Sequence, residues 1–305
     1  MISIITALHG RIDLTRQFWK SLAQNQPQCD WEIVWVDDGS SDGTREWLRR
    51  LDSAHCRFVF NDKNLGYAAS NNIGVRAACG DVLFFLNNDL LLQKDWFAPL
   101  AEVISSTQDI GIAGNVQLNV TTGRIDHAGI CYDLIGRADH YLKGRALSTL
   151  RGQGRFSHAV TSACCAIRRD LFLSSGGFDE AFRNGCEDVD LCLRLGQMGY
   201  RHWVDYRSVV YHHVSASPGR KDYEMQNQAL FLKRWGHLTS KWGQEDWPQN
   251  YLSRYSHCPW KLNGTKTVDA LLRLAGLKHG DSKWVAKKRE EILTCVSLAQ
   301  SKETG

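Results

Sequence analysis

The chain has 305 residues, of which 43% are hydrophobic, and a formal net charge of +4. That much apolar side chain can bury a substantial core, in one large domain or in two smaller ones. Because the basic residues are scattered along the chain, the sequence lacks the basic stripe of a nucleic-acid-binding protein, and we expect no nucleic-acid partner.

The ten cysteines bear on the cellular compartment. None of them forms a CxxC pair, and Cys164 and Cys165 are adjacent. A chain of this length and hydrophobicity does not need disulfides, so we expect reduced, mostly buried thiols in a cytosolic protein. No signal peptide is recognised at the first residues, and no apolar run approaches the ~20 residues that span a bilayer. We therefore expect a cytoplasmic protein, with peripheral attachment to the inner membrane face as the alternative.

The first hundred residues alternate between apolar runs and amphipathic segments. They predict strands at residues 2–7, 31–36, 57–60 and 81–86, separated by helices at residues 14–24, 44–51 and 66–78. Near-continuous apolar strands in this alternation are typical of an α/β fold with a mostly parallel sheet covered on both faces. Such sheets bind ligands beyond the carboxyl ends of their strands, where the polar clusters of this sequence fall.

The second strand is closed by two acids, Asp37 and Asp38, before the sequence GSSDGT. The serines and glycines predict a tight turn, and Asp42 or Thr44 can cap the helix that follows. A turn alone does not account for two acids at the strand end. A carboxylate at this position suits an imide or a ribose hydroxyl, so we interpret the pair as part of a nucleotide site.

Small residues mark the start of the third helix, in the sequence NLGYAASNNIG at residues 64–74. Gly66, Ala69 and Gly74 would let this helix begin close to a ligand or pack closely on the sheet. A helix N-terminus that faces a pocket favours phosphate. On the sequence alone, phosphate binding and simple packing are equally good interpretations.

The fourth strand ends in Asn87, Asn88 and Asp89. Amide and carboxylate oxygens suit a hard divalent cation, whose remaining ligands would be phosphates and water. Such a cation would offset the charge of a departing diphosphate. A turn rich in Asn and Asp is the alternative interpretation.

The periodicity weakens after Pro99. Strands are predicted at residues 111–118, 160–168 and 200–211, and helices at residues 187–198 and 223–235. Residues 121–156 show little periodicity, and a long irregular insert of this kind is usually functional or disordered. The tail from residue 236 contains several tryptophans and ends in a basic amphipathic stretch at residues 283–293.

Two adjacent acids, Glu187 and Asp188, open the predicted helix at residues 187–198. Neighbouring helical residues point in different directions, so one acid could face a reactive centre while the other holds the preceding loop or a substrate hydroxyl. An aspartate in this position can also take the proton of such a hydroxyl. Complementing the helix dipole is the alternative interpretation of acids in a first turn.

Two histidines, His212 and His213, follow the last predicted strand. An isolated histidine is usually a packed core or surface residue. Two of them at a strand end, on a sheet that already offers Asp89, indicate contact with a metal ion or a phosphate.

Taken in order, these segments resemble the family 2 glycosyltransferases of the GT-A fold over residues 2–235. The resemblance is carried by the sequences VDDGSSDGT, NLGYAASNNIG, LFFLNND, GGFDE, CEDVDLCLRLGQMGYR and HHVSAS. It is closest to bacterial rhamnosyltransferase-like members, which carry NND in place of DxD. The resemblance implies an inverting transfer of a sugar from a nucleoside-diphosphate donor to an acceptor hydroxyl, in the synthesis of cell-surface polysaccharide or glycoconjugates.

The resemblance also implies roles for individual residues. The donor would be contacted by Ala7, Asp37, Asp38, Asn64, Gly66, Asn87 and Asn88. Asp89 would replace the last acid of DxD and bind a divalent cation, Mg²⁺ or Mn²⁺. Asp188 matches the family's catalytic base, with Glu187 beside it.

Towards the end of the matched region, the family has a residue that binds the metal or the diphosphate. His212 best matches this residue, because Ser217 follows at the family's usual interval, and His213 is the alternative. Arg234 and Trp235 are loosely similar to a distal arginine-aromatic motif.

Two features depart from the family pattern. Asn87 replaces the first acid of DxD, which weakens metal binding, and the sequence LHGR after the first strand replaces a start similar to Pro-Val-Tyr-Asn.

The resemblance implies a UDP-, dTDP- or GDP-sugar as donor and a glycan, a lipid-linked or a protein-linked molecule as acceptor. Residues 121–156 and the tryptophan-rich tail are expected to shape the acceptor site. The basic residues at 283–289 favour a solvated helix face, with contact to anionic lipid as the alternative if the acceptor is lipid-linked. The sequence indicates neither the sugar, the linkage nor the oligomeric state.

The expected domain organisation is a GT-A domain at residues 1–235 and a helical C-terminal extension at residues 236–305. Within the first domain, residues 1–110 would bind the nucleotide sugar, and residues 111–235 would form the acceptor and catalytic half. A Rossmann-type oxidoreductase is disfavoured, because the first strand is not followed by GxGxxG. A non-catalytic sugar-nucleotide or glycan-binding module is the remaining alternative, and the Glu187-Asp188 pair argues against it.

Overall fold

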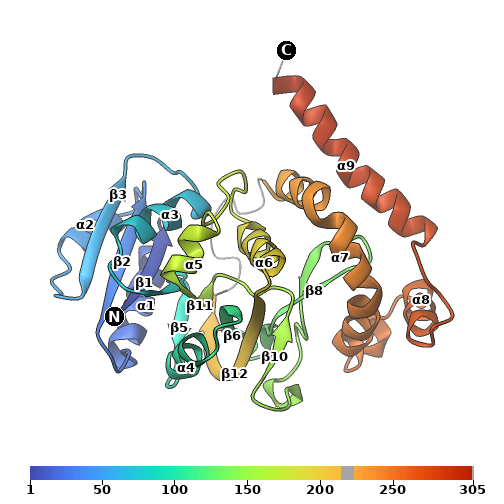
Figure 1. The fold of residues 1–305 in the computed structure, drawn as a ribbon, viewed down its shortest axis with the longest axis horizontal. Helices are drawn as coiled ribbons and strands as arrows, with labels where there is room; N and C mark the ends of the chain where they lie inside the picture. Colours follow the sequence, from blue (N-terminus) through green and yellow to red (C-terminus); the bar gives the residue numbers. More distant parts are fainter. Residues whose placement is uncertain (214–222, 304–305) are drawn as a thin grey trace.

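The apolar runs at the start of the chain form the parallel half of a large sheet (Figure 1). A computed structural model describes residues 1–213 and 223–303. Its first four strands are β1 (Ile2–Leu8), β2 (Trp31–Asp38), β3 (Cys56–Asn61) and β4 (Val82–Leu86). They are parallel and lie in the order β3-β2-β1-β4. The predicted alternation of strands and helices is therefore confirmed in this half.

The connecting helices bury the two faces of this half of the sheet. They are α1 (Ile12–Gln24), α2 (Thr44–Arg49) and α3 (Tyr67–Ala77). On β1, Ile4 packs in the same core cluster as Phe18 of α1, whereas Ile5 packs in the cluster that contains Val75 of α3. Successive strand side chains point to opposite faces, so a fully apolar strand is buried between two helical layers.

The second half of the sheet is mixed. It contains β6 (Ile110–Asn119), β11 (Cys164–Arg168) and β12 (Arg201–His212), with β10 (Gly154–Ser157) at the edge. β11 runs antiparallel between β4 and β6, and β12 is parallel to β6. Two short strands are added, β5 (Leu90–Leu92) antiparallel to β12 and β7 (Ile125–His127) antiparallel to β6. Helices α4 (Ala98–Ser106), α5 (Arg169–Ser174) and α6 (Glu187–Gln197) complete this half.

The irregular insert at residues 121–156 is ordered into small pieces. Besides β7 and β10 it contains a hairpin of β8 (Ile130–Tyr132) and β9 (Ala138–His140), and a 3₁₀ turn at Leu147–Thr149. Strands of three residues carry too few positions to show periodicity. The sequence pattern therefore could not predict them.

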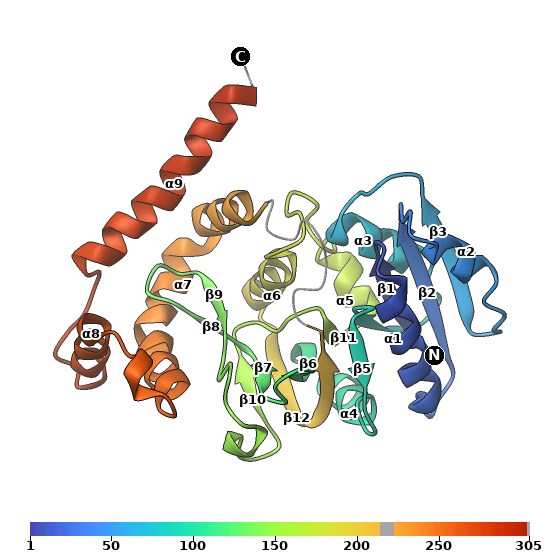
Figure 2. The same ribbon diagram turned by 180° about the vertical axis from the view of Figure 1, so that it is seen from behind.

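A long helix, α7 (Glu224–Tyr255), runs across residue 235, where a domain boundary was expected. It lies against the β8–β9 hairpin, and Gly243 allows the close approach, because a Cβ there would overlap the carbonyl oxygen of Asp133. α8 (Gly264–Leu274) and α9 (Lys283–Glu303) follow, after a 3₁₀ turn at Pro259–Lys261. Val285 and Ile292 of α9 join a small core cluster with residues of the hairpin and of α7. Figure 2 shows α8 and α9 at the end of the molecule remote from β3.

Within residues 1–213 and 223–303, no helix combines the length and the hydropathy needed to cross a membrane. The nine cysteines described in that part of the chain are free thiols, and Cys164, Cys165 and Cys192 are among those that are buried.

His202 of β12 holds α6 against the sheet. Its side chain is 2% exposed, and Nε2 donates to the carbonyl oxygen of Cys192 at 2.8 Å. Burial lowers the pKa of His202 to about 4, well below its ordinary value, so the ring is neutral in the folded chain at neutral pH. This residue therefore contributes to stability above about pH 6.5, and the contribution is lost as the pH falls towards 4.

We expect the His202→Gln variant to show a flatter pH dependence of stability than the wild type, because glutamine can donate the same hydrogen bond and does not titrate. Between pH 7 and pH 4, the wild type should lose about 3 kcal/mol more of its free energy of unfolding than the variant. Urea denaturation at several pH values measures this difference. Parallel pH profiles for the two proteins would show that His202 is not protonated on unfolding.

Candidate active site

The main pocket lies at the carboxyl ends of the parallel strands. It encloses about 360 Å³, a size typical of small-molecule sites. Ala7 from β1, Asp38 from β2 and the turn after β4 line it. The residues before β11, the end of β12 and the first turn of α6 line it as well. The structure thus brings Asp89 and Asp188, a hundred residues apart, to one pocket.

Asp38 fixes the loop between β3 and α3. Its Oδ1 accepts hydrogen bonds from the backbone N–H of Leu65 at 2.8 Å and from Asn61 Nδ2 at 2.9 Å, and Oδ2 accepts from the N–H of Gly66 at 2.9 Å. Gly66 has a φ of +91°, which favours glycine. Asn64 lines the pocket, whereas Gly66 is not among the lining residues. The backbone amides near the start of α3 are therefore occupied by a protein carboxylate, and the phosphate interpretation of this helix start is not supported.

Asp37 lies outside the pocket, contrary to expectation. Its side chain is fully buried; Oδ2 accepts from Arg45 Nε at 2.6 Å and Oδ1 from the N–H of Ser40 at 3.2 Å. Asp38, the next residue along the strand, does line the pocket. Asp37 therefore helps to hold the turn, and its contact with the nucleotide stays a prediction.

The turn after β4 is tied to two other elements. Asn88 Nδ2 donates to Thr15 Oγ1 of α1 at 2.8 Å. β5 then pairs with the end of β12, which places His212 beside the turn, and His212 Nε2 lies 3.2 Å from Asp89 Oδ1. Asn87, Asn88, Asp89 and His212 all line the pocket. The alternative metal residue, His213, is not among the lining residues, although its backbone N–H donates to the Asp89 carbonyl. Ser217 lies outside the described residues.

A second carboxylate, Asp126 of β7, lies on the other side of His212. Asp126 Oδ2 is 3.7 Å from His212 Nδ1, and Asp126 Oδ1 is 2.7 Å from Lys143 Nζ. Burial raises the pKa of Asp126, but contacts with His212, His140 and Lys143 hold it well below its usual range, so this residue is an anion at neutral pH. Burial likewise opposes the charged form of His212, yet the contacts with Asp126 and Asp89 raise its pKa to about 9.

The residues around Asp89 fit a divalent cation only in part. Asn87 Oδ1 is buried without a hydrogen-bond partner among the described residues. Asp89 Oδ1 and the ring nitrogens of His212 are also buried, and they meet each other and Asp126 as ion pairs without aligned hydrogen bonds. Such atoms are suited to metal coordination. However, no group of three His, Cys, Asp or Glu side chains in that part of the chain could hold a metal ion. A cation here would therefore need further oxygen ligands from a bound diphosphate and water.

The acids at the start of α6 both line the pocket, but their partners differ. Asp188 is half-buried, and its Oδ2 accepts a hydrogen bond from the N–H of Ser162 at 3.1 Å. Glu187 is 6% exposed, and its Oε2 accepts from the N–H of Gly185 at 2.6 Å. Glu187 thus holds the loop that precedes the helix. One of the two acids was expected to hold this loop, and the role of Asp188 at a reactive centre stays a prediction.

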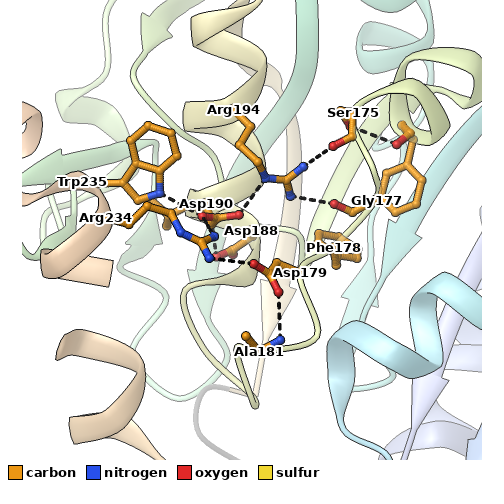
Figure 3. A network of polar contacts seen from close by, with 12 residues as sticks. Ser175, Gly177, Phe178, Asp179, Ala181, Asp188, Asp190, Arg194, Arg234 and Trp235 are labelled. Carbon is orange, nitrogen blue, oxygen red and sulfur yellow. Dashed lines mark hydrogen bonds and ion pairs between the residues drawn. The ribbon is translucent and has the colours of Figure 1, made fainter. Parts of the chain in front are cut away.

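Asp190, one turn further into α6, holds together the elements behind the pocket (Figure 3). It is fully buried and accepts hydrogen bonds from Arg194 Nε at 2.8 Å, Arg234 Nη1 at 2.6 Å and Trp235 Nε1 at 2.8 Å. Arg194 also donates to the Gly177 carbonyl at 2.6 Å. The loop before α6, the helix and α7 are therefore fixed relative to one another by this carboxylate.

Arg234 makes one more contact, an ion pair with Asp179 at 2.9 Å in the same loop. The sequence GGFDE and the distal Arg-Trp pair thus meet at Asp190, although they are more than fifty residues apart. The sequence alone does not predict these contacts, because nothing near Arg234 and Trp235 in the chain indicates their partner.

Several pocket residues were not identified from the sequence. They are His9, Arg11, Gln117, Asp126, His140, Lys143 and Asn184. The signal for Asp126 was an acid within a short aliphatic segment of a region rich in Gly, His and Tyr, which is weak. Residues 121–156 were expected to shape part of the site, and several of their side chains do line the pocket.

Comparison with known proteins finds one matching family model, several longer relatives and a shared fold. The model of the family described as "Glycosyl transferase family 2" matches residues 3–174. The "O-antigen biosynthesis protein RfbC" of Myxococcus xanthus is 33% identical over 226 residues, which are 71% of this chain and 17% of that protein. The "Uncharacterized protein y4gI" of Sinorhizobium fredii is 28% identical over 261 residues, which are 81% of this chain and 28% of that protein. The chain thus spans less than a third of the length of these relatives.

A solved structure with the same fold is that of GalNAc-T7 with UDP, GalNAc and Mn²⁺. Its TM-score is 0.60 at 20% sequence identity, over 96% of this chain and 55% of that chain. At this identity the likeness concerns the fold alone.

Proposed function

The chain belongs to glycosyl transferase family 2, and on that premise we propose that it transfers a sugar from a nucleoside-diphosphate donor to an acceptor hydroxyl, with inversion at the anomeric carbon. The observation that carries the proposal is the single pocket lined by Asp89, His212, Glu187 and Asp188. Asp89 and His212 offer ligands for a diphosphate-bound cation, and Asp188 offers a carboxylate at a helix start in the same pocket. The relative named for O-antigen biosynthesis supports a role in polysaccharide synthesis.

The donor nucleotide would bind at the ends of β1 and β2, where Ala7, His9 and Asp38 line the pocket. Asp38 is already fixed by backbone donors, so its position does not depend on the ligand. A UDP-, dTDP- or GDP-sugar would meet the same groups, and the rhamnosyltransferase-like specificity stays a prediction.

The diphosphate would lie by the turn after β4. Asp89 and the deprotonated ring of His212 would hold a divalent cation, Mg²⁺ or Mn²⁺, together with oxygens of the diphosphate, and Asn87 could add an amide oxygen. When bound, such a cation neutralises the charge that develops on the leaving diphosphate. The UDP, GDP-mannose and Mn²⁺ named in structures of this fold support both assignments.

Asp188 would act as the general base. Its carboxylate takes the proton of the acceptor hydroxyl while that oxygen attacks the anomeric carbon. The bond from the anomeric carbon to the diphosphate oxygen breaks on the opposite face, and the nucleoside diphosphate leaves. The hydrogen bond from Ser162 N–H orients the carboxylate, and Glu187 holds the loop beneath it. The acceptor, a glycan or a lipid- or protein-linked molecule, would approach past residues 121–156.

The test is a panel of UDP-, dTDP- and GDP-sugars, screened by thermal shift with and without Mn²⁺ or Mg²⁺ and then by product analysis with candidate acceptors. A donor that raises the melting temperature and is consumed supports the proposal, because a ligand that binds the folded state stabilises it. Stabilisation by a donor that is neither transferred nor hydrolysed would instead indicate a non-catalytic sugar-nucleotide-binding module.

We expect the Asp89→Ala variant to lose the dependence of nucleotide affinity on divalent cations. Outer ligands of metal sites contribute about 10–100-fold to affinity, so removing a direct ligand should weaken Mn²⁺-dependent binding of the nucleoside diphosphate by at least about tenfold. Calorimetry with and without Mn²⁺ measures this loss. Asp62→Ala, which removes an exposed aspartate, should leave the Mn²⁺ effect intact. An undiminished Mn²⁺ effect in Asp89→Ala would refute the assignment.

A further inference from the structure

Helix α8 exposes its apolar side and buries its charged side. Asp269, Ala270 and Arg273 are buried at 3%, 0% and 8% exposure, whereas Leu271 and Leu274 are 53% and 48% exposed. A surface helix of a folded protein normally turns its apolar stripe towards the core and its charged residues to water. The polarity of α8 is inverted relative to that rule.

A network of buried polar contacts fixes this orientation. Asp269 Oδ1 lies 2.8 Å from Arg273 Nε and 2.9 Å from Lys278 Nζ, and Asp269 Oδ2 accepts a hydrogen bond from Ser282 Oγ at 2.8 Å. Arg273 also donates to the Gly280 carbonyl at 2.9 Å. Rotating the helix to bury its leucines would break these contacts and leave charges without partners, which is costly. The outward orientation of the leucines is therefore built into the fold.

The exposed apolar residues continue past both ends of the helix. We call Trp260, Val268, Leu271, Leu272, Leu274 and Leu277 the α8 apolar face. Trp260 and Leu277 are 79% and 76% exposed. The described residues contain twelve exposed large hydrophobic side chains, and six of them lie in this segment of eighteen residues. Scattered exposed leucines need no explanation, but a concentration of this kind marks an interaction site.

The net positive charge of the chain comes from the same segment. Residues 260–289 contain eight lysines and arginines against two aspartates, whereas the whole chain has 37 basic and 33 acidic residues. The rest of the chain therefore has more acidic than basic residues. Lys261, Lys266, Lys283 and Lys287 are exposed, and both aspartates are ion-paired within the segment.

We propose that the α8 apolar face docks on the surface of a bilayer that contains anionic lipid. An interfacial helix of this type buries its apolar residues at the boundary of headgroups and acyl chains, while neighbouring lysines contact the phosphates. Figures 1 and 2 show α8 at the edge of the molecule, outside α7, where a flat surface can reach it. A second copy of the chain is a poorer partner, because it would bring two strongly basic segments together. This inference does not depend on sugar transfer.

Flotation with lipid vesicles tests the proposal directly. The full chain should float with vesicles of phosphatidylcholine and phosphatidylglycerol, and much less with vesicles of phosphatidylcholine alone. Raising the salt concentration should reduce binding to the anionic vesicles, because salt screens the attraction between lysines and phosphates. Equal binding to both vesicle types, or binding to neither, would overturn the proposal.

Variants of exposed side chains identify the surface without endangering the fold. Replacing Leu271 and Leu274 together by serine should reduce partitioning onto anionic vesicles by at least about tenfold, since two apolar side chains no longer enter the interface. Leu173→Ser is the matched control, because Leu173 on α5 is 48% exposed, as Leu274 is. Replacing Lys283 and Lys287 by glutamine should weaken binding and also flatten its salt dependence.

Two outcomes of these variants count against the proposal. If Leu173→Ser reduces binding as much as the double variant, the interaction is not specific to α8. If light scattering shows a dimer that the Leu271→Ser, Leu274→Ser variant converts to a monomer, the α8 apolar face is occupied by a second copy. In either case the result leaves the proposed transfer reaction untouched, since neither assay measures turnover.

Discussion

Replacing Asp188 by asparagine is expected to reduce sugar transfer by about 10²–10⁴-fold, the usual contribution of a general base. Asparagine keeps an oxygen that can accept the hydrogen bond from Ser162 N–H, so the loop and the pocket should be preserved. It cannot accept a proton at neutral pH, however. Donor binding by calorimetry should therefore remain close to that of the wild type while turnover falls, which separates a role in chemistry from a role in binding.

The neighbouring Glu187→Gln variant is the control for that experiment. Both substitutions exchange a carboxylate for an amide in the same pocket, and Glu187 accepts its hydrogen bond from the loop residue Gly185. We expect a smaller loss of turnover for Glu187→Gln than for Asp188→Asn. If the order is reversed, Glu187 is the base. If Asp188→Asn turns over at the wild-type rate, no proton passes to Asp188 in the rate-limiting step.

Replacing Asp190 by alanine is expected to cost about 3 kcal/mol of the free energy of unfolding. Removing one partner of a buried ion pair typically costs about 3–5 kcal/mol, because it leaves the other charge without compensation. Asp190 is fully buried, but the side chains of Arg194 and Arg234 are 23% and 34% exposed and can reach water. We therefore expect the lower part of that range. Urea denaturation monitored by tryptophan fluorescence measures it, since Trp235 also loses its hydrogen-bond acceptor.

The matched control for this variant is Asp109→Ala. Asp109 pairs with Arg201 at the surface, where the two side chains are 48% and 55% exposed. Exposed pairs contribute at most about 1 kcal/mol, so this variant should remain close to the wild type. Similar losses in the two variants would mean that the contacts in Figure 3 do not act as a buried network.

Local sequence patterns account for the first half of the fold but not for contacts between distant elements. The fold of residues 1–86 could be predicted, because each strand is a continuous apolar run and each helix has its own periodicity. The direction in which the Asp37 side chain points could not be predicted in this way. Both acids end the same strand, and only the structure shows that Asp38 lines the pocket while Asp37 pairs with Arg45.

Much of the candidate site depends on contacts that no local pattern contains. His212 lies beside Asp89 because β5 pairs with β12 more than a hundred residues later in the chain. Asp126 and Lys143 join them from an insert whose strands are only three or four residues long, too short to show a period. From the local sequence, a charged residue in such a short strand cannot be distinguished from a charged residue in a loop.

The sequence alone determined the α/β class, the family resemblance and the polar strand ends, because these follow from hydrophobic periodicity and from short motifs within single segments. Only the tertiary structure decided which acids share the pocket, which carboxylate holds Arg194, Arg234 and Trp235, and which side of α8 faces water. The physical reason is that burial and ion pairing are set by packing between distant segments, whereas periodicity records only how one segment divides its own residues between two faces.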